Sequence, residues 1–241
     1  MKDRSTTNAP SLKRILVINP NTNYRISARV QKESEKILGA NTRITVMNPD
    51  TGPLSIETLE HRNEAVPKTI ALAQASLDQN YDACALACFD DIGLHEIRSF
   101  AGVPVIGPFE ASITAARSVA KRFTIVTTVH SAVPGINELI RHYGVSDICT
   151  VRAAGIGVAQ AALGGEATQA LIEQAITDAT ELDKAEAIIL GSGGLTGSAP
   201  MLAKKFGIPV IDAILAAVKI AEGLAGIPSI SRKGLVQPST H

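Results

Sequence analysis

The sequence contains no tryptophan, few aromatic residues of any kind (3%) and no excess of charge, since 23 Lys and Arg balance 23 Asp and Glu. Proteins that bind nucleic acids use clustered basic side chains and aromatic rings that stack on bases, so this composition argues against a nucleic-acid partner. No apolar run approaches the roughly 18 residues of a membrane span, and residues 1–11 are polar. We therefore expect neither a membrane segment nor a signal peptide.

Cysteine is also scarce. Cys84, Cys88 and Cys149 lie in apolar segments and cannot all be paired, which argues against a disulfide scaffold and fits a reducing compartment. We expect a cytoplasmic protein whose partner is a small molecule. With 241 residues, of which 45% are apolar and 19% charged, the chain is sufficient for one large or two small domains with a real core.

Short runs rich in Val, Ile and Leu alternate with longer segments of helical periodicity, a pattern typical of βαβ units around a buried parallel sheet. The predicted strands are 15–19, 43–47, 83–88, 103–106, 124–128, 146–152, 187–190 and 208–211. The clearest predicted helices are 25–38, 67–79, 112–121, 131–142, 166–181 and 213–224. The ends, before about residue 11 and after about residue 228, carry no such pattern and are expected to be loose.

An internal repeat organises these elements. Residues 14–23 (RILVINPNTN) align in pattern with 122–131 (RFTIVTTVHS), 82–93 with 186–197, and 103–107 with 208–212, at offsets of 108, 104 and 105 residues. Three matches in one order and at nearly one offset indicate a duplicated unit. We predict an α/β protein of two similar flavodoxin-like halves, 12–112 and 120–227, with mostly parallel sheets related by a pseudo-twofold axis and a cleft between them.

Ligands of open α/β sheets bind beyond the carboxyl ends of the strands, so the residues that directly follow each strand are the candidates for a site. Four such places carry distinctive residues: Asn19-Pro20-Asn21-Thr22, Cys88-Phe89-Asp90-Asp91, Thr127-Thr128 and Gly191-Ser192-Gly193-Gly194. Under the repeat, Asn19 matches Thr127 and Cys88 matches Ser192. Matched side chains in two facing halves would approach one ligand from opposite sides.

That arrangement suits inversion of a carbon beside a carbonyl, which needs one group to remove a proton and another to return one to the opposite face. A thiol has an ordinary pKa of about 8.5 and is able to act as either acid or base near neutrality. The backbone N–H groups of residues 89–91 and 193–195 would stabilise a carboxylate or an enolate oxygen without metal or cofactor.

The chain resembles the aspartate/glutamate/hydantoin racemase superfamily, and within it the hydantoin and allantoin racemases. The resemblance runs from about residue 12 to 227. It is carried by ILVINPNTN at the start, ACFDDIGL around Cys88, VPVIGPFEAS closing the first half, RFTIVTT opening the second, and LGSGGL around Ser192. It implies racemisation by two cysteines, one from each half, without a cofactor or metal, in a homo-oligomer.

Carried over residue by residue, the resemblance makes Cys88 one acid/base and places Ser192 where the family has its second cysteine. The substrate-binding residues that it implies are Asn19, Asn21, Thr22, Phe89, Asp90, Glu110, Thr127, Thr128, Gly193 and Gly194. The resemblance implies binding by the backbone N–H groups beside the two acid/base positions, at Phe89, Asp90, Gly193 and Gly194. It implies a role for Glu110 because this residue lies in the family's Glu-Ala segment at the cleft.

Ser192 departs from the family pattern, because a hydroxyl is far less acidic than a thiol. Either Ser192 is an introduced replacement, which would trap substrate, or the natural protein works differently. For a two-base racemase we expect impaired turnover with serine at this position. A single-cysteine decarboxylase exists in the superfamily, but its cysteine lies in the second half. The remaining alternatives are an Asp/Glu-type amino-acid racemase and a non-catalytic protein that binds the ligand. A ureide is favoured because the four strand-end places offer Asn and Thr but no arginine.

Each of these residues also has a purely structural interpretation. Cysteine is often buried filler, and Asn-Pro-Asn-Thr is a common turn and helix cap. Asp90 and Asp91 favour a helix start through the dipole. Residues 191–197 have the composition of a dinucleotide loop but the spacing Gly-x-Gly-Gly-x-x-Gly, and Leu190 breaks the Gly-x-Ser-x-Gly motif of hydrolases.

Overall fold

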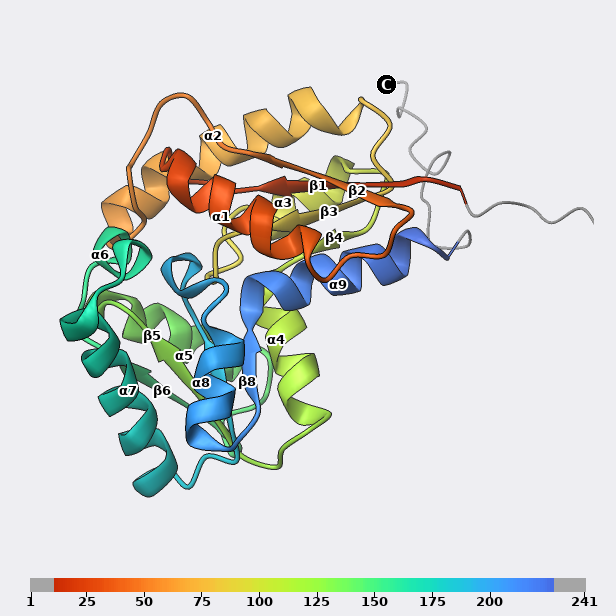
Figure 1. Ribbon diagram of the computed structural model, residues 1–241. Helices are drawn as coiled ribbons and strands as arrows, with labels where there is room; N and C mark the ends of the chain where they lie inside the picture. Colours follow the sequence, from red (N-terminus) through yellow and green to blue (C-terminus); the bar gives the residue numbers. More distant parts are fainter. Residues whose placement is uncertain (1–10, 228–241) are drawn as a thin grey trace, which may run out of the picture.

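The computed structural model describes residues 11–227. It contains two four-stranded sheets in which every pairing is parallel (Figure 1). The first sheet, in the order β2-β1-β3-β4, consists of β1 (Lys13–Ile18), β2 (Thr42–Met47), β3 (Ala83–Leu86) and β4 (Val105–Ile106). The second, in the order β6-β5-β7-β8, consists of β5 (Phe123–Thr127), β6 (Cys149–Ala153), β7 (Ala187–Leu190) and β8 (Val210–Asp212). The predicted α/β class with two similar parallel sheets is confirmed.

The register of the two sheets reproduces the sequence repeat. Ile15 pairs with Ala83 in the first sheet as Phe123 pairs with Ala187 in the second. Just beyond these strands, the Ala87 N–H donates to the Ile18 carbonyl, and the Gly191 N–H donates to that of Val126. Cys88 and Ser192 therefore directly follow equivalent strands at equivalent depths.

The helices lie close to their predicted positions, with differences at their ends. They are α1 (Tyr24–Glu35), α2 (Leu59–Leu77), α3 (Leu94–Phe100), α4 (Pro108–Arg117), α5 (Val133–His142), α6 (Val158–Leu163), α7 (Glu166–Glu181), α8 (Ala199–Phe206) and α9 (Ala213–Ala225). Short 3-10 turns also occur: η1 (His130–Ala132) precedes α5, and η2 (Gly193–Leu195) follows Ser192. The expectation that the chain ends are loose concerns residues outside the described range.

Helix α2 begins eight residues before the start that Pro67 predicted. The Thr58 hydroxyl caps it by accepting the His61 N–H at 3.2 Å. Pro67 lies inside the helix, where its ring removes one hydrogen-bond donor, but it does not end the helix. The two additional turns carry Arg62 toward the ends of the central strands.

Each sheet is covered partly by the last helix of the other half. Helix α9 packs on the first sheet, where Ile214, Ala217 and Val218 join the core of β1 and β3. Helix α4 packs on the second sheet, where Phe109 and Ile113 join the core of β5 and β7. The two helices also contact each other between the sheets (Figure 1). This exchange fixes the two sheets relative to one another.

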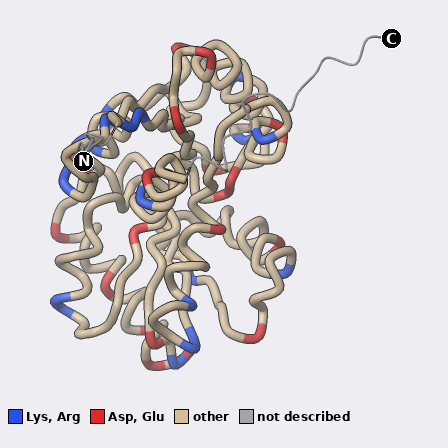
Figure 2. Tube along the Cα trace, turned by 90° about the vertical axis from the view of Figure 1, so that its right-hand side faces the viewer, with Lys and Arg blue, Asp and Glu red and all other residues tan. Residues whose placement is uncertain are grey.

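Both sheets are therefore covered on both faces, which explains why β1, β3, β5 and β7 are almost entirely buried. Helices α2 and α3 cover the remaining face of the first sheet, and α7 and α8 that of the second. Basic and acidic residues are interspersed along the trace in Figure 2. No helix within residues 11–227 combines the length and the apolar character needed to cross a membrane.

Candidate active site

A small cavity lies between the ends of the two sheets, and both halves contribute to it. From the first half it is lined by Asn21, Ile56, Ala87, Cys88, Phe89 and Asp90, and from the second by Thr127, Thr128, Val129, Ala132, Val158, Gly191, Ser192 and Gly193. Its volume of about 40 Å³ holds about three water molecules. A ring-shaped ligand would therefore need the cavity to widen.

Cys88 lines this cavity as a free, partly exposed thiol, whereas Cys84 and Cys149 are buried in the cores. Burial raises the pKa of the Cys88 thiol, and the nearby Asp90 carboxylate raises it further. The Asp90 N–H, which donates to the sulfur, and the Arg62 guanidinium act in the opposite direction on this pKa. In the closed cavity, Cys88 is therefore a neutral thiol at pH 7.

Ser192 lines the cavity from the second half and is held by two donors. Its oxygen accepts the Thr128 hydroxyl at 3.2 Å and the Gly194 N–H at 3.3 Å. A hydroxyl has two lone pairs and one hydrogen, so with both lone pairs engaged only its own O–H is available to a ligand. Ser192 is thus arranged as a hydrogen-bond donor and not as a base.

The backbone beside the two matched residues offers a second pair of donors. The N–H groups of Phe89 and Gly193, which are equivalent under the repeat, have no hydrogen-bond acceptor within the described part of the chain. The neighbouring N–H groups of Asp91 and Leu195 are used by the Cys88 and Ser192 carbonyls. Phe89 and Gly193 can therefore bind the oxygen of an enolate from both halves.

The Asn-Pro-Asn-Thr turn serves as both a helix cap and a wall of the cavity. The Asn23 side chain caps α1 by accepting the Arg25 N–H, and the Asn21 side chain accepts the Asn23 N–H at 2.9 Å. Asn19 is fully buried and orients Asn21 by donating to its side-chain oxygen at 3.1 Å. Among the three asparagines, only Asn21 faces the cavity.

A segment of the first half, residues 53–58, crosses to the second half over this cavity; we call it the bridging loop. The Glu57 carboxylate accepts the Val158 N–H at 2.8 Å, and its backbone carbonyl accepts the Ser131 hydroxyl. Thr22 anchors the start of the loop through its N–H and its hydroxyl, both of which donate to the Pro53 carbonyl. Ile56 extends from this loop into the lining of the cavity.

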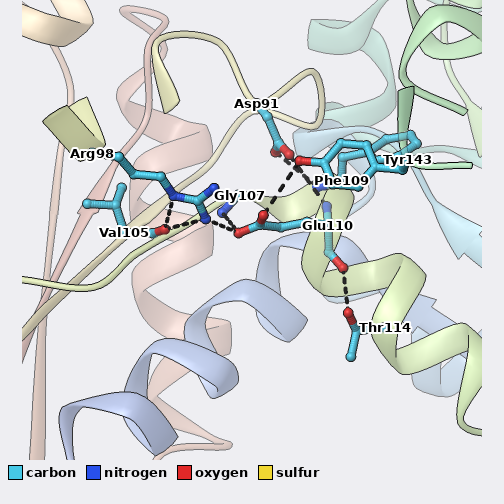
Figure 3. A network of polar contacts seen from close by, with 8 residues as sticks. All are labelled: Asp91, Arg98, Val105, Gly107, Phe109, Glu110, Thr114 and Tyr143. Carbon is cyan, nitrogen blue, oxygen red and sulfur yellow. Dashed lines mark hydrogen bonds and ion pairs between the residues drawn. The ribbon is translucent and has the colours of Figure 1, made fainter. Parts of the chain in front are cut away.

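Four of the predicted binding residues do not line the cavity: Asn19, Thr22, Glu110 and Gly194. Asn19, Thr22 and Gly194 support residues that do. Glu110 is part of a separate network at the start of α4, where it pairs with Arg98 and accepts the Gly107 N–H at 3.2 Å (Figure 3). Its role there is to cap the helix, because a carboxylate in the first turn satisfies free N–H groups. The predicted helix began only at residue 112, whereas α4 begins at Pro108 and includes Glu110 in its first turn.

Asp91 also serves α4 and not the helix that directly follows it. Its carboxylate accepts the Phe109 N–H at 3.0 Å and points into the same network (Figure 3). Burial raises the pKa of Asp91 to about 8, against the effect of the two backbone donors. Asp90, in contrast, lines the cavity. Burial raises its pKa as well, and Arg62 lowers it.

Within residues 11–227, no group of three or more His, Cys, Asp or Glu side chains is arranged to hold a metal ion. The groups with acid/base capacity at the cavity are Cys88 and Asp90 from one side and Ser192 from the other. Donors from both halves converge on the space between them. The arrangement is suited to proton transfer at a carbon whose neighbouring oxygen is held by N–H groups.

Comparison with known proteins supplies the family. The Asp/Glu/Hydantoin racemase family matches residues 15–221. The chain belongs to this family. A hydantoin racemase of Rhizobium meliloti is 36% identical over 213 residues, which cover 88% of each chain. The expected assignment to the racemases, which are isomerases, is confirmed at the level of the family.

Two solved structures of allantoin racemases have the same fold. That from Klebsiella pneumoniae has a TM-score of 0.89 and 31% identity, and the match covers 95% of each chain. That from Pseudomonas fluorescens has a TM-score of 0.84 and 30% identity, and the match covers 91% of this chain and 93% of that one. At this coverage the similarity extends over both sheets.

Proposed function

We propose that this protein exchanges the proton on the stereogenic ring carbon of a hydantoin- or allantoin-type ureide, without a cofactor, and that Cys88 is its principal acid/base. The observation that carries the proposal is the placement of Cys88 and Ser192 after equivalent strands, in the lining of one cavity. The family membership and the hydantoin and allantoin racemases among the relatives support this substrate class.

In the proposed reaction, the Cys88 thiolate takes the proton from the ring carbon beside the carbonyl. The electron pair of the broken C–H bond moves onto the carbonyl oxygen, where the N–H groups of Phe89 and Gly193 stabilise the negative charge. When Cys88 returns a proton to the same face, the C–H bond forms again with its original configuration. In D₂O the thiol equilibrates with solvent, and the carbon gains deuterium without inversion.

Inversion requires a proton from the opposite face, where this chain has Ser192. The serine hydroxyl can donate a hydrogen bond but is a poor acid, and its engaged lone pairs make it a poorer base. We therefore expect proton exchange with one enantiomer and slow inversion. Positioned acid/base groups contribute about 10²–10⁴-fold to rates, so a thiol at this position should restore inversion by about 100-fold or more.

The test compares the unmodified protein with Ser192→Cys in D₂O, following deuterium incorporation and optical rotation for each enantiomer of allantoin and of a 5-substituted hydantoin. Ser76→Cys is a matched control, because Ser76 is a buried serine in α2, outside the cavity. Exchange without inversion by the unmodified protein, together with racemisation by Ser192→Cys only, supports the proposal.

Three results would count against it. Exchange by neither protein above the uncatalysed rate would remove the proposed activity and favour a binding protein. Undiminished exchange after Cys88→Ala would remove the role of Cys88. Fast inversion by the unmodified protein would show that Ser192 does not limit the reaction.

A further inference from the structure

A larger groove adjoins the cavity on its outer side, and we call it the outer groove. It has a volume of about 660 Å³ and lies between the bridging loop, the start of α2 and helix α5. Ile56, Asp90 and Ala132 line both the groove and the inner cavity, so the two spaces are continuous. A ligand whose ring occupies the widened cavity would extend its substituent past these three residues into the groove.

Asp90 and Arg62 form an ion pair at this junction. The distance from Arg62 Nη1 to Asp90 Oδ2 is 3.8 Å, which is longer than a hydrogen bond. Within residues 11–227, neither of these two side chains has a hydrogen-bond partner. The Asp90 side chain is only 22% exposed. Both side chains line the outer groove, so their polar atoms are available to a group that enters it.

The other charged groups of the groove are less well placed for this role. Glu57 is occupied by the Val158 N–H and the Ser55 hydroxyl. Glu138 and His142 lie one turn apart on α5, on exposed positions of the outer wall. Among the charged residues of the groove, Asp90 also lines the inner cavity, and Arg62 is its ion-pair partner.

We propose that Arg62 and Asp90 bind the substituent on the reacting ring carbon and favour a ureido or amide group over a hydrocarbon one. This inference rests on the proposed function. A ureido group carries a C=O that accepts from the guanidinium and N–H groups that donate to the carboxylate, so it satisfies both partners at once. A hydrocarbon substituent would leave both unsatisfied and would cover them from water.

The test uses two ligands of the same shape. Allantoin carries a ureido substituent, and 5-isobutylhydantoin carries a branched hydrocarbon with the same number and branching of heavy atoms. Dissociation constants are measured by calorimetry for the unmodified protein and for Arg62→Gln, Arg62→Lys and Asp90→Asn. Lys68→Gln is the control, because Lys68 is also a basic residue of α2 in an ion pair, with Glu64, but lines neither space.

We expect Arg62→Gln and Asp90→Asn to weaken allantoin binding about tenfold or more, as is typical for the loss of a charged hydrogen bond, and to leave 5-isobutylhydantoin within about twofold. Arg62→Lys should retain part of the affinity, since it keeps the charge but loses the planar fork. Lys68→Gln should change neither ligand. Any effect of Arg62 on Cys88 acts on both ligands and cancels in their ratio.

Equal losses for both ligands, or no loss for allantoin, would overturn the role of the pair while leaving the proposed function in place. Failure of the unmodified protein to bind either ligand would overturn both. Racemisation by Ser192→Cys distinguishes a failure of the Arg62–Asp90 role from a failure of the proposed function, because it tests the reaction without any change at Arg62 or Asp90.

Discussion

Cys88 and Ser192 occupy matched positions, yet their surroundings give them different chemical roles. Cys88 has a carboxylate and a guanidinium nearby and a raised pKa, and Ser192 has two neutral donors on its oxygen. The repeat predicts that the two residues face one ligand. It does not predict this difference, because Arg62 and Thr128 come from segments with no equivalent contact in the other half.

The raised pKa of Cys88 makes a prediction about pH. Burial and the negative charge of Asp90 disfavour the thiolate, so the thiolate fraction at neutral pH is small and grows about tenfold per pH unit. The Cys88-dependent rate of deuterium incorporation should rise in this way from pH 6.5 to 9, without a plateau near the ordinary thiol pKa of about 8.5.

The measurement is the initial exchange rate at each pH, with the rate for Cys88→Ala subtracted to remove the uncatalysed reaction. A plateau that begins below pH 9 would contradict the prediction, because it would mean that the folded protein does not raise the pKa of this thiol above its ordinary value.

At the scale of elements, the beginnings of α4 and α9 show how the two halves differ in detail. Gly107 directly precedes α4, and Asp212 directly precedes α9. The two residues match under the repeat, and each lies where the last strand of its sheet ends. Asp212 caps α9 with its own side chain by accepting the Leu215 N–H at 3.1 Å. At α4 the carboxylate comes from Asp91, and it fills the space that a side chain at residue 107 would need.

We therefore expect Gly107→Ala to be destabilising. An added Cβ would overlap the Asp91 carboxyl group, which cannot move without losing its hydrogen bonds to the α4 backbone. Overpacking of this kind costs about 1–3 kcal/mol, measurable as a lower free energy of unfolding in urea.

Gly223→Ala in α9 is the control, and it should raise the free energy of unfolding instead of lowering it. Gly223 has no atom within 4 Å of its added Cβ, so alanine there should stabilise the helix by about 0.5–1 kcal/mol. If Gly107→Ala has the same free energy of unfolding as the unmodified protein, the conclusion that the Asp91 carboxylate is held in a fixed position is wrong.

At the scale of the whole molecule, the strands of the first sheet lie within residues 12–112 and those of the second within 120–227, but each core also contains a helix from beyond its own sheet. Helix α9 completes the core of the first sheet and α4 that of the second. The inner cavity depends on this exchange, because its walls come from both sheets.

The exchange predicts that the halves do not fold separately. A fragment of residues 1–119 lacks α9 and would expose the apolar surface that Ile214, Ala217, Val218 and Ala221 cover. We expect it to show no cooperative thermal transition by circular dichroism, whereas the full chain unfolds in one transition.

Mixing this fragment with residues 120–241 should restore a cooperative transition, since each piece supplies the helix that the other lacks. A cooperative transition of the isolated fragment near that of the full chain would instead make the first half an independent domain.

The sequence by itself determined the pattern of the molecule: parallel sheets from buried apolar runs, a duplication from three matched segments, and Cys88, Ser192, Asn21, Thr127 and Thr128 at strand ends. These follow from local periodicity and from the rule that parallel strands end at one edge. Only the tertiary structure decided the contacts between distant segments. It directed Glu110 and Asp91 to the start of α4, extended α2 past Pro67 so that Arg62 reaches Asp90, and exchanged α4 and α9 between the sheets. Such choices depend on which surfaces remain to be covered once both sheets exist, and no local pattern carries that information.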